Sequence, residues 1–186
     1  MSISTRIKMS QYDEMIREGR FEPREEHRVE LIYGEILPMS PINAPHNYLV
    51  GLLLEWSFEV LPRKQVFVNS QGPIGIPEFD SEPQPDLVWA RRRNYRSELP
   101  STADILLVVE VSDRSLSKDR GLKARLYAAA GIADYWIVNI NGQCVEVQRD
   151  PDGSTYRSSE SFHVGQEVHP LAFPDVSLPV ELIFPA

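Results

Sequence analysis

The chain has 186 residues, of which 42% are hydrophobic and 25% charged, a composition typical of one globular domain rather than a disordered or fibrous chain. Its net charge of −8 argues against indiscriminate, high-affinity binding of nucleic acid, because such binding derives its energy from phosphate neutralisation. A nuclease is not excluded, since an acidic metal site needs bound cations before it accepts phosphate.

The sequence shows no feature that would place the protein in a membrane or outside the cell. The longest apolar run, residues 105–109, is too short to cross a bilayer, and no early segment has the pattern of a signal peptide. The single cysteine, Cys144, rules out an internal disulfide and lies in an alternating, strand-like segment, which predicts a buried structural thiol. We therefore expect a cytoplasmic protein without a membrane partner.

The N-terminal half predicts helices and strands in alternation. Residues 10–18 form a helix with Ser10 as its cap, and residues 28–37 form two short strands joined at Tyr33–Gly34. Apolar residues at three- and four-residue steps predict an amphipathic helix that begins near Pro45, with Asn43 as its cap, and ends at Pro62. A short strand at 65–69 and an irregular loop or edge hairpin at 71–85 follow.

The C-terminal half predicts the centre of a sheet. Residues 86–89 and 105–111 are strands, and the second is apolar without alternation, as expected for a strand covered on both faces. A helix at 117–130 ends at Gly131, and Asn141–Gly142 joins strands 135–140 and 143–148. The tail is β-like and rich in proline. Because no repeat or linker divides the chain, we treat residues 1–186 as a single α/β domain.

Glu110 and Asp86 are the acids whose positions indicate chemistry. Glu110 follows five apolar residues in the most buried strand, where an unpaired carboxylate would be costly, so it needs an open strand end, a metal or a cation. Asp86 begins a neighbouring strand. Two carboxylates at adjoining strand ends suit Mg²⁺, which takes oxygen ligands completed by water and phosphate. Asp86 could instead be a strand-start acid bound to nearby amides.

Lys123 is the cation best placed to meet these acids. At about 100° per residue, it falls within an apolar arc of the 117–130 helix, whereas Lys118 and Arg125 lie at or beyond the edge of that arc. An inward lysine needs an acidic partner, which Asp86 and Glu110 would provide. The alternative is a lysine whose aliphatic stem covers apolar surface while its ammonium group reaches water.

These residues resemble a known nuclease signature. Pro85–Asp86 followed by Glu110–Val111–Ser112 resembles the PD-(D/E)XK motif of restriction endonucleases. Residues 119–123, Tyr127, Gly131 and 135–136, together with 30–36 and 40–41, are similar to the bacterial restriction endonucleases of the Uma type. The resemblance covers about residues 10–175. It implies a restriction-endonuclease-like core, in which helices flank a central mixed β-sheet.

The chain departs from the superfamily motif at Ser112, where a lysine is expected. In the Uma-type family a lysine of the following helix is thought to replace it, and Lys123 occupies that position. Tyr33 stands where the family has aspartate before the turn glycine. The resemblance also suggests Glu30 as a further acid near the metal and a role for His46. Without it, Glu30 would be a solvated strand glutamate, and His46 a residue that packs or caps. Gln84 would only shape its loop.

The resemblance implies metal-dependent hydrolysis of phosphodiester bonds, with DNA as the substrate. Asp86 and Glu110 would bind Mg²⁺, or Mn²⁺ in its place, the Val111 carbonyl would be a further ligand, and Lys123 and Glu30 would complete the catalytic set. A homodimer is expected, because many endonucleases pair two sites.

Two other classes of function stay open. The fold could be an inactive, nuclease-like binding or regulatory module, as the missing motif lysine and the acidic charge suggest. A self-associating structural protein would leave the inward acids and lysine unexplained. The arginines between Arg91 and Arg96 could hold the DNA backbone or form a solvated loop, and the solvated loop is the preferred interpretation.

Overall fold

The computed structural model describes residues 6–21 and 28–185. Its centre is a six-stranded sheet in the order β3-β4-β5-β6-β7-β8. β5 and β6 pair in parallel, and the other neighbouring strands pair antiparallel, so the sheet is mixed as predicted. The strands are β3 (Val66–Ser70), β4 (Leu87–Arg91), β5 (Ile105–Ser112), β6 (Asp134–Asn139), β7 (Cys144–Pro151) and β8 (Tyr156–His163).

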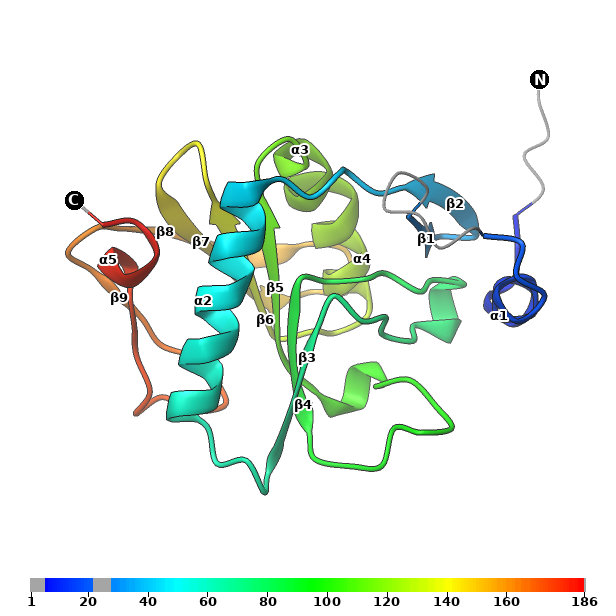
Figure 1. The fold of residues 1–186 in the computed structure, drawn as a ribbon, viewed down its shortest axis with the longest axis horizontal. Coiled ribbons are helices and arrows are strands. Elements are labelled where there is room, and N and C mark those ends of the chain that lie inside the picture. The colour runs from blue at the N-terminus through cyan, green and yellow to red at the C-terminus, as the bar shows by residue number, and fades with distance from the viewer. Residues whose placement is uncertain (1–5, 22–27, 186) are drawn as a thin grey trace.

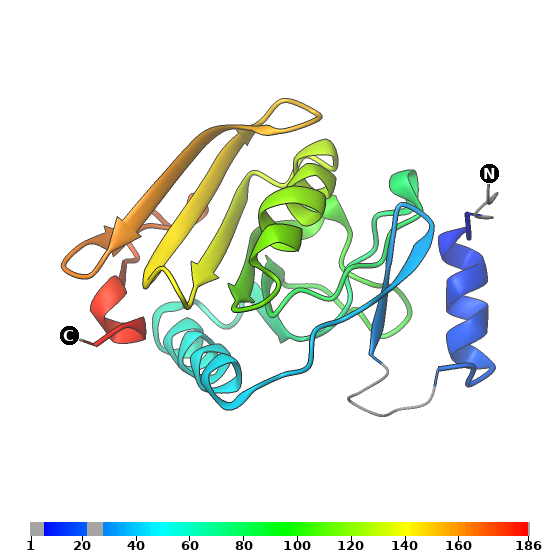
Figure 2. The same cartoon turned by 90° about the horizontal axis from the view of Figure 1, so that it is seen from above.

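Helices cover both faces of the sheet (Figures 1 and 2). On one face lie α2 (Ala44–Val60) and the short α5 (Val180–Ile183), whose buried apolar residues share one core with Leu107, Val109 and Val111 of β5. On the other face, Leu126 and Tyr127 belong to a second core that includes Val108 of β5. β5 is therefore covered on both faces, as its continuous apolar sequence predicts.

The helix predicted at 117–130 contains an irregular turn. It consists of α3 (Leu116–Lys118), a π-helical turn η4 (Asp119–Lys123) and α4 (Ala124–Ala129). A π turn closes from residue i to i+5 and is often found at functional sites. Tyr135 donates its hydroxyl to the carbonyl of Asp119 at 3.1 Å, and this bond anchors the π turn to the sheet.

The N-terminal elements form a separate layer beside the sheet. α1 (Met9–Arg17) precedes the two-stranded sheet β1 (Val29–Ile32) and β2 (Glu35–Pro38), whose turn residues Tyr33 and Gly34 have φ of 51° and 75°. Tyr33 therefore occupies a left-handed turn position that aspartate also tolerates. A bridge between Leu31 and Glu82 attaches this layer to the loop before β4. That loop contains the short helix η2 (Pro77–Phe79).

The remaining short elements lie before β5 and in the C-terminal tail. The short helix η3 (Thr102–Asp104) precedes β5, and the β-like tail contains β9 (Glu167–Val168) and β10 (Leu178–Pro179). The sequence did not predict α5. Cys144 is buried on β7, as its strand-like surroundings predict. Among the described residues, no helix is both long enough and apolar enough to cross a bilayer.

Candidate active site

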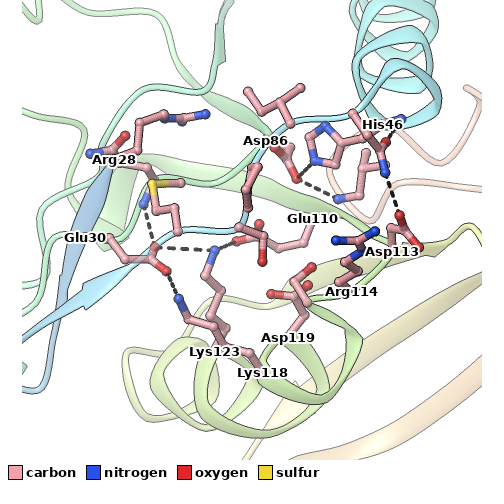
Figure 3. Close-up of a pocket in the computed structure, with 18 residues that line it drawn as sticks. Arg28, Glu30, His46, Asp86, Glu110, Asp113, Arg114, Lys118, Asp119 and Lys123 are labelled. Atoms are coloured by element: carbon pink, nitrogen blue, oxygen red, sulfur yellow. Dashed lines mark hydrogen bonds and ion pairs between the residues drawn. The ribbon is translucent and has the colours of Figure 1, made fainter. Parts of the chain in front are cut away.

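A cavity of about 150 Å³ opens where β4 begins and β5 ends (Figure 3). Its walls come from β1, the start of α2, the loop before β4 and the segment from the end of β5 to the π turn. Each predicted site residue lines it: Glu30, His46, Gln84, Asp86, Glu110, Val111 and Lys123. Residues distant in sequence thus share one space.

Glu110 is at the floor of this cavity and is only 3% exposed. Its Oε1 atom accepts hydrogen bonds from the Lys123 ammonium group and the Tyr127 hydroxyl, both at 2.8 Å. Its Oε2 atom accepts none from residues 6–21 or 28–185. Burial raises the pKa of Glu110 well above its usual value; Lys123 opposes this shift, and the carboxylates of Asp119 and Asp86 add to it.

Asp86 is held in one orientation by two donors. Its Oδ2 atom accepts the Val111 N–H at 2.8 Å and lies 3.2 Å from Nε2 of His46. Its Oδ1 atom accepts no hydrogen bond within the described part of the chain. Asp86 therefore does bind an amide, as its alternative interpretation proposes, and still has one oxygen available on the cavity side.

His46 does more than pack or cap the helix, because its ring contacts Asp86. The cap of α2 is Asn43, whose side chain accepts the His46 backbone N–H at 3.0 Å. Nδ1 of the His46 ring is buried, and no described residue bonds it. The histidine therefore belongs to the surroundings of Asp86.

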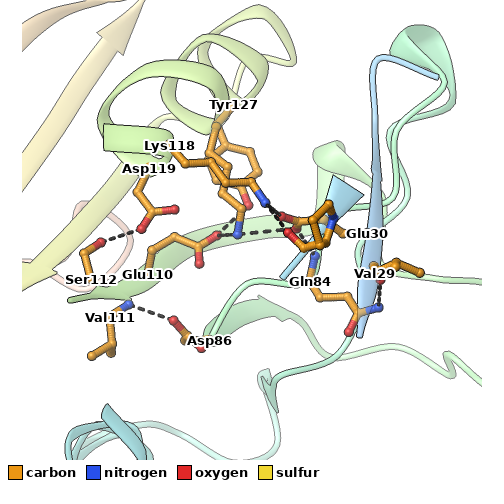
Figure 4. A network of polar contacts seen from close by, with 12 residues as sticks. Val29, Glu30, Gln84, Asp86, Glu110, Val111, Ser112, Lys118, Asp119 and Tyr127 are labelled. Atoms are coloured by element: carbon orange, nitrogen blue, oxygen red, sulfur yellow. Dashed lines mark hydrogen bonds and ion pairs between the residues drawn. The ribbon is translucent and has the colours of Figure 1, made fainter. Parts of the chain in front are cut away.

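Lys123 points inward, as the helical wheel predicts, and its side chain is 5% exposed. Its ammonium group lies 2.8 Å from Glu110 Oε1 and 3.4 Å from Glu30 Oε2, so it joins two carboxylates (Figure 4). Burial lowers the pKa of Lys123, but Glu110 and Glu30 outweigh that effect and raise it above its usual value. The lysine is a buried cation and does not snorkel to water.

Glu30 is 1% exposed, so the interpretation of this residue as a solvated strand glutamate is wrong. It accepts the Gln84 N–H at 3.2 Å and lies 2.5 Å from the Lys118 ammonium group. Burial alone would raise its pKa, yet Lys123 and Lys118 hold the pKa of Glu30 below its usual value. Gln84 therefore shapes more than its loop, since its backbone binds an acid of the cavity.

The π turn explains why two lysines reach the same glutamate. In a regular α-helix, residues five apart point about 140° away from each other, at about 100° per residue. The π turn brings residues five apart towards one face, so Lys118 and Lys123 both face Glu30. The wheel placed Lys118 at the edge of the arc because it assumed a regular helix.

Ser112, which replaces the motif lysine, is completely buried. Its hydroxyl donates to Asp119 Oδ2 at 2.6 Å, and Asp119 lines the cavity with 2% of its surface exposed. Burial raises the pKa of Asp119 above its usual value, although Lys123 opposes the shift. A serine here therefore fixes a further acid at the start of the π turn.

Comparison with known protein families identifies the chain. Residues 9–181 match the family Uma2, described as "Putative restriction endonuclease". The chain belongs to this family. The match spans nearly the whole sequence and includes every residue assigned above to the cavity.

A solved structure has the same fold as this family member. It is described as "a putative nuclease belonging to DUF820 from Anabaena variabilis ATCC 29413", and it superposes with a TM-score of 0.73. The two sequences are 16% identical, and the similarity covers 96% of this chain and 97% of the other. The restriction-endonuclease-like fold is confirmed. No curated protein matches the sequence.

The cavity of this Uma2 member offers few but suitable ligands for a hard cation. Among the described residues, no three His, Cys, Asp or Glu side chains gather as an all-protein metal site. Asp86 and Glu110 each keep an oxygen free of hydrogen bonds from described residues, and Mg²⁺ is usually bound through one or two carboxylates with water. The donor set therefore fits Mg²⁺ and does not fit a fully protein-ligated ion.

Several residues that no sequence pattern assigns to the site contribute to it in the structure. Tyr127 and Asp119 lie within the family motif, but only their contacts show that they bind Glu110 and Ser112. Arg114 lines the cavity from the turn after β5. The arginines between Arg91 and Arg96, in contrast, do not line it.

Proposed function

We propose that this protein is a metal-dependent nuclease that hydrolyses phosphodiester bonds in DNA. The observation that carries the proposal is the pair Asp86 and Glu110, whose unused oxygens share one cavity with the buried ammonium group of Lys123. Asp86 and Glu110 would hold Mg²⁺, or Mn²⁺ in its place. Such an ion lowers the pKa of a bound water and neutralises charge on the phosphate.

The Val111 carbonyl is a suitable third ligand. The Val111 N–H points to Asp86, whereas the carbonyl of the next residue, Ser112, accepts the Ile140 N–H on the β6 side. Alternate residues of a strand turn their backbone groups to opposite edges. The Val111 carbonyl is therefore on the side of Asp86. Pro85 lies opposite it when the β4–β5 register is continued, and it has no N–H to donate.

The chain's own residues would orient and stabilise the reacting group. The Val111 N–H and His46 fix the Asp86 carboxylate. Glu110 and Glu30 keep Lys123 charged, so it would stabilise negative charge that develops on the phosphate. Glu30 thereby acts through Lys123 as a positioning residue.

The charge of the cavity favours binding of a metal cation before the nucleic acid. Five carboxylates and four Lys or Arg cations line it, so its formal charge is slightly negative. A divalent cation would reverse that sign and favour a phosphodiester. The net charge of −8 is therefore compatible with a nucleic-acid substrate.

The proposal is tested by cleavage of plasmid DNA with Mg²⁺ or Mn²⁺. We expect Lys123→Met to slow cleavage about 10²–10³-fold, the usual loss when one electrostatic donor is removed. Asp86→Asn and Glu110→Gln should abolish it, whereas Glu59→Gln, an exposed glutamate on α2, should cleave like the parent. A parent protein that cleaves neither DNA nor RNA over a wide range of salt would refute the proposal.

The second candidate is an inactive, nuclease-like binding module, favoured by Ser112 at the motif position. Titration calorimetry with Mn²⁺ separates metal binding from catalysis. An active site should bind Mn²⁺ and lose that binding in Asp86→Asn. Metal binding without cleavage would favour the binding module, and unchanged binding in the variant would place the metal elsewhere.

We also propose that the protein acts as a homodimer. The cavity described above is formed by a single chain, and cutting both strands of a duplex calls for two such sites. Sedimentation equilibrium would show a dimer, whereas a monomer that makes double-strand breaks would contradict it.

A further inference from the structure

Two arginines flank the Asp86–Glu110 pair at the cavity (Figure 3). Arg28 precedes β1 and lies on one side of the pair, and Arg114 lies on the other side, in the turn between β5 and α3. Neither arginine is among the groups that bind these two acids: Lys123 and Tyr127 bind Glu110, and the Val111 N–H and His46 bind Asp86.

Arg114 is exposed, and both oxygens of its neighbour Asp113 accept hydrogen bonds from other side chains. One oxygen of Asp113 accepts the Asn43 side-chain amide at 2.6 Å, and the other accepts that of Asn141 at 3.2 Å. Arg114 makes no ion pair with any residue that the structure describes. A guanidinium group is thereby kept at the mouth of the cavity with its donors available.

The other cations near the cavity are already committed. Lys118 lies 2.5 Å from Glu30, and Lys123 is shared by Glu30 and Glu110. The arginines between Arg91 and Arg96 are far away, since Arg91 ends β4 about 17 Å from Asp86 at the rise of a strand. Arg114 is therefore the lining cation that has no acidic partner among the described residues, and Arg28 is the other arginine that lines the cavity.

We propose that Arg28 and Arg114 bind backbone phosphates of a nucleic-acid strand, on either side of the phosphodiester above Asp86 and Glu110. This inference rests on the proposed function. Guanidinium groups suit the task because they bind phosphate oxygens through paired N–H donors. The strand crosses the cavity from the start of β1 to the β5–α3 turn, and the basic loop 91–96 does not contact it.

The test measures binding, separately from cleavage, by fluorescence anisotropy of a labelled DNA duplex. Ca²⁺ replaces Mg²⁺ as an oxygen-preferring cation, and the dissociation constant is measured between about 50 and 200 mM KCl. The slope of log affinity against log salt changes by about 0.9 for each neutralised phosphate of a duplex. Arg28→Ala and Arg114→Ala should each weaken binding several-fold and reduce this slope by about 1.

Two control variants separate the position of the charge from its presence. Arg96→Ala removes an exposed arginine from the 91–96 loop and should leave the slope unchanged. Arg114→Lys should keep the slope, because the slope counts charges, while it loses the paired donors and some affinity. Equal slope changes in Arg96→Ala and Arg114→Ala would overturn the inference, as would parent binding that does not depend on salt.

Competition distinguishes a strand from a single anion. Inorganic phosphate at the same phosphate concentration should displace the duplex much less well than unlabelled duplex does, and equal displacement would overturn the strand proposal. Cleavage by the parent with an unchanged slope in Arg114→Ala would refute this inference alone. A reduced slope without any cleavage would refute the proposed nuclease and leave the binding site standing.

Discussion

Two buried acids of the same sheet, Asp134 and Glu110, differ in how completely their oxygens are used. Asp134 begins β6 and is 1% exposed. Its Oδ1 accepts the Trp136 indole N–H and the Arg149 Nε–H, both at 2.8 Å, and its Oδ2 accepts the Leu171 N–H at 2.8 Å. Glu110 receives both of its donors on Oε1, and no described residue bonds Oε2.

The difference separates a structural acid from a candidate catalytic one. The donors of Asp134 come from β6, β7 and the C-terminal segment, so this carboxylate ties the tail to the sheet. Glu110 and Asp86 both line a cavity, and each keeps one oxygen without a hydrogen bond from a described residue. Burial alone therefore does not identify a site. Unused acceptors beside a cavity are what make Glu110 and Asp86 candidates.

The largest effect on stability is expected at the fully bonded acid. Asp134→Ala leaves Arg149 without its carboxylate and should cost about 3–5 kcal/mol in the free energy of unfolding, as when a buried ion pair loses one member. Urea denaturation measures this loss. Asp175→Ala, at an exposed position in the tail, is the control and should change stability little.

Asp134→Ala also tests the distinction between structural acids and candidate catalytic acids. Folded Asp134→Ala should bind Mn²⁺ as the parent does, because none of its contacts reaches the cavity. Asp86→Asn should show the reverse, with lost Mn²⁺ binding and a small change in stability. Similar effects of both variants on both measurements would contradict the division into structural and catalytic acids.

Glu82 is a buried acid with an unused oxygen, and it does not line the cavity of Asp86 and Glu110. It is 3% exposed, and no described residue bonds its Oε2 atom. Burial, reinforced by Asp13, raises the pKa of Glu82 to about 8. The folded protein therefore keeps this carboxyl protonated at pH 7, whereas the unfolded chain ionises it near pH 4.5. The contribution of Glu82 to the free energy of unfolding is fully present below about pH 4.5 and is lost as the pH rises towards 8.

Glu82→Gln should remove that dependence on pH. The variant should resemble the parent at pH 4 and exceed its stability at pH 7 by on the order of 3 kcal/mol, because each pKa unit is worth about 1.4 kcal/mol. Thermal denaturation at several pH values measures the difference. A stability difference that is constant from pH 4 to 8 would show that Glu82 has the same pKa in the folded and the unfolded protein.

The sequence predicted the site where the local geometry is regular. In β5, Val108 belongs to one core and Val109 and Val111 belong to the other, which is the alternation of a regular strand. The helical wheel correctly turned Lys123 inward. Glu30 was assigned to the site only from the family resemblance, because no local pattern indicates it. The roles of these residues in metal binding and catalysis stay predictions.

Features that depend on irregular backbone or distant contacts could not be predicted. No periodic rule indicates the π turn at 119–123, and without it the pairing of Lys118 with Glu30 is invisible. The bonds of Asp134 join residues 15 and 37 positions away, which no local pattern relates. Arg114 lies in a turn, where its sequence position says nothing about its direction.

A smaller effect on stability than at Asp134 or Glu82 is expected at Arg120, whose side chain supports the π turn beside Lys123. Its guanidinium group donates to both oxygens of Glu146 on β7, at 2.7 and 2.6 Å, and Asn139 adds a bond at 2.8 Å. Because the Arg120 side chain is half-exposed, Arg120→Ala should cost only about 1–2 kcal/mol, the low end for charge-assisted bonds. Arg157→Ala, which removes a surface pair with a 3.8 Å separation, should cost less than 1 kcal/mol.

Arg120→Ala also separates two contributions to cleavage: metal binding by Asp86 and Glu110, and the position of Lys123. Asp86 and Glu110 do not contact the Arg120–Glu146 pair, so Arg120→Ala should bind Mn²⁺ with unchanged affinity. The π turn carries Lys123, however, so the cleavage rate should fall several-fold, and Arg120→Lys should restore part of it. An unchanged rate in Arg120→Ala would show that Glu110 and Glu30 alone fix Lys123. A loss of Mn²⁺ binding would instead show that the Arg120–Glu146 pair also holds Asp86 and Glu110 in position. The metal-binding acids and Lys123 would then depend on the same contact.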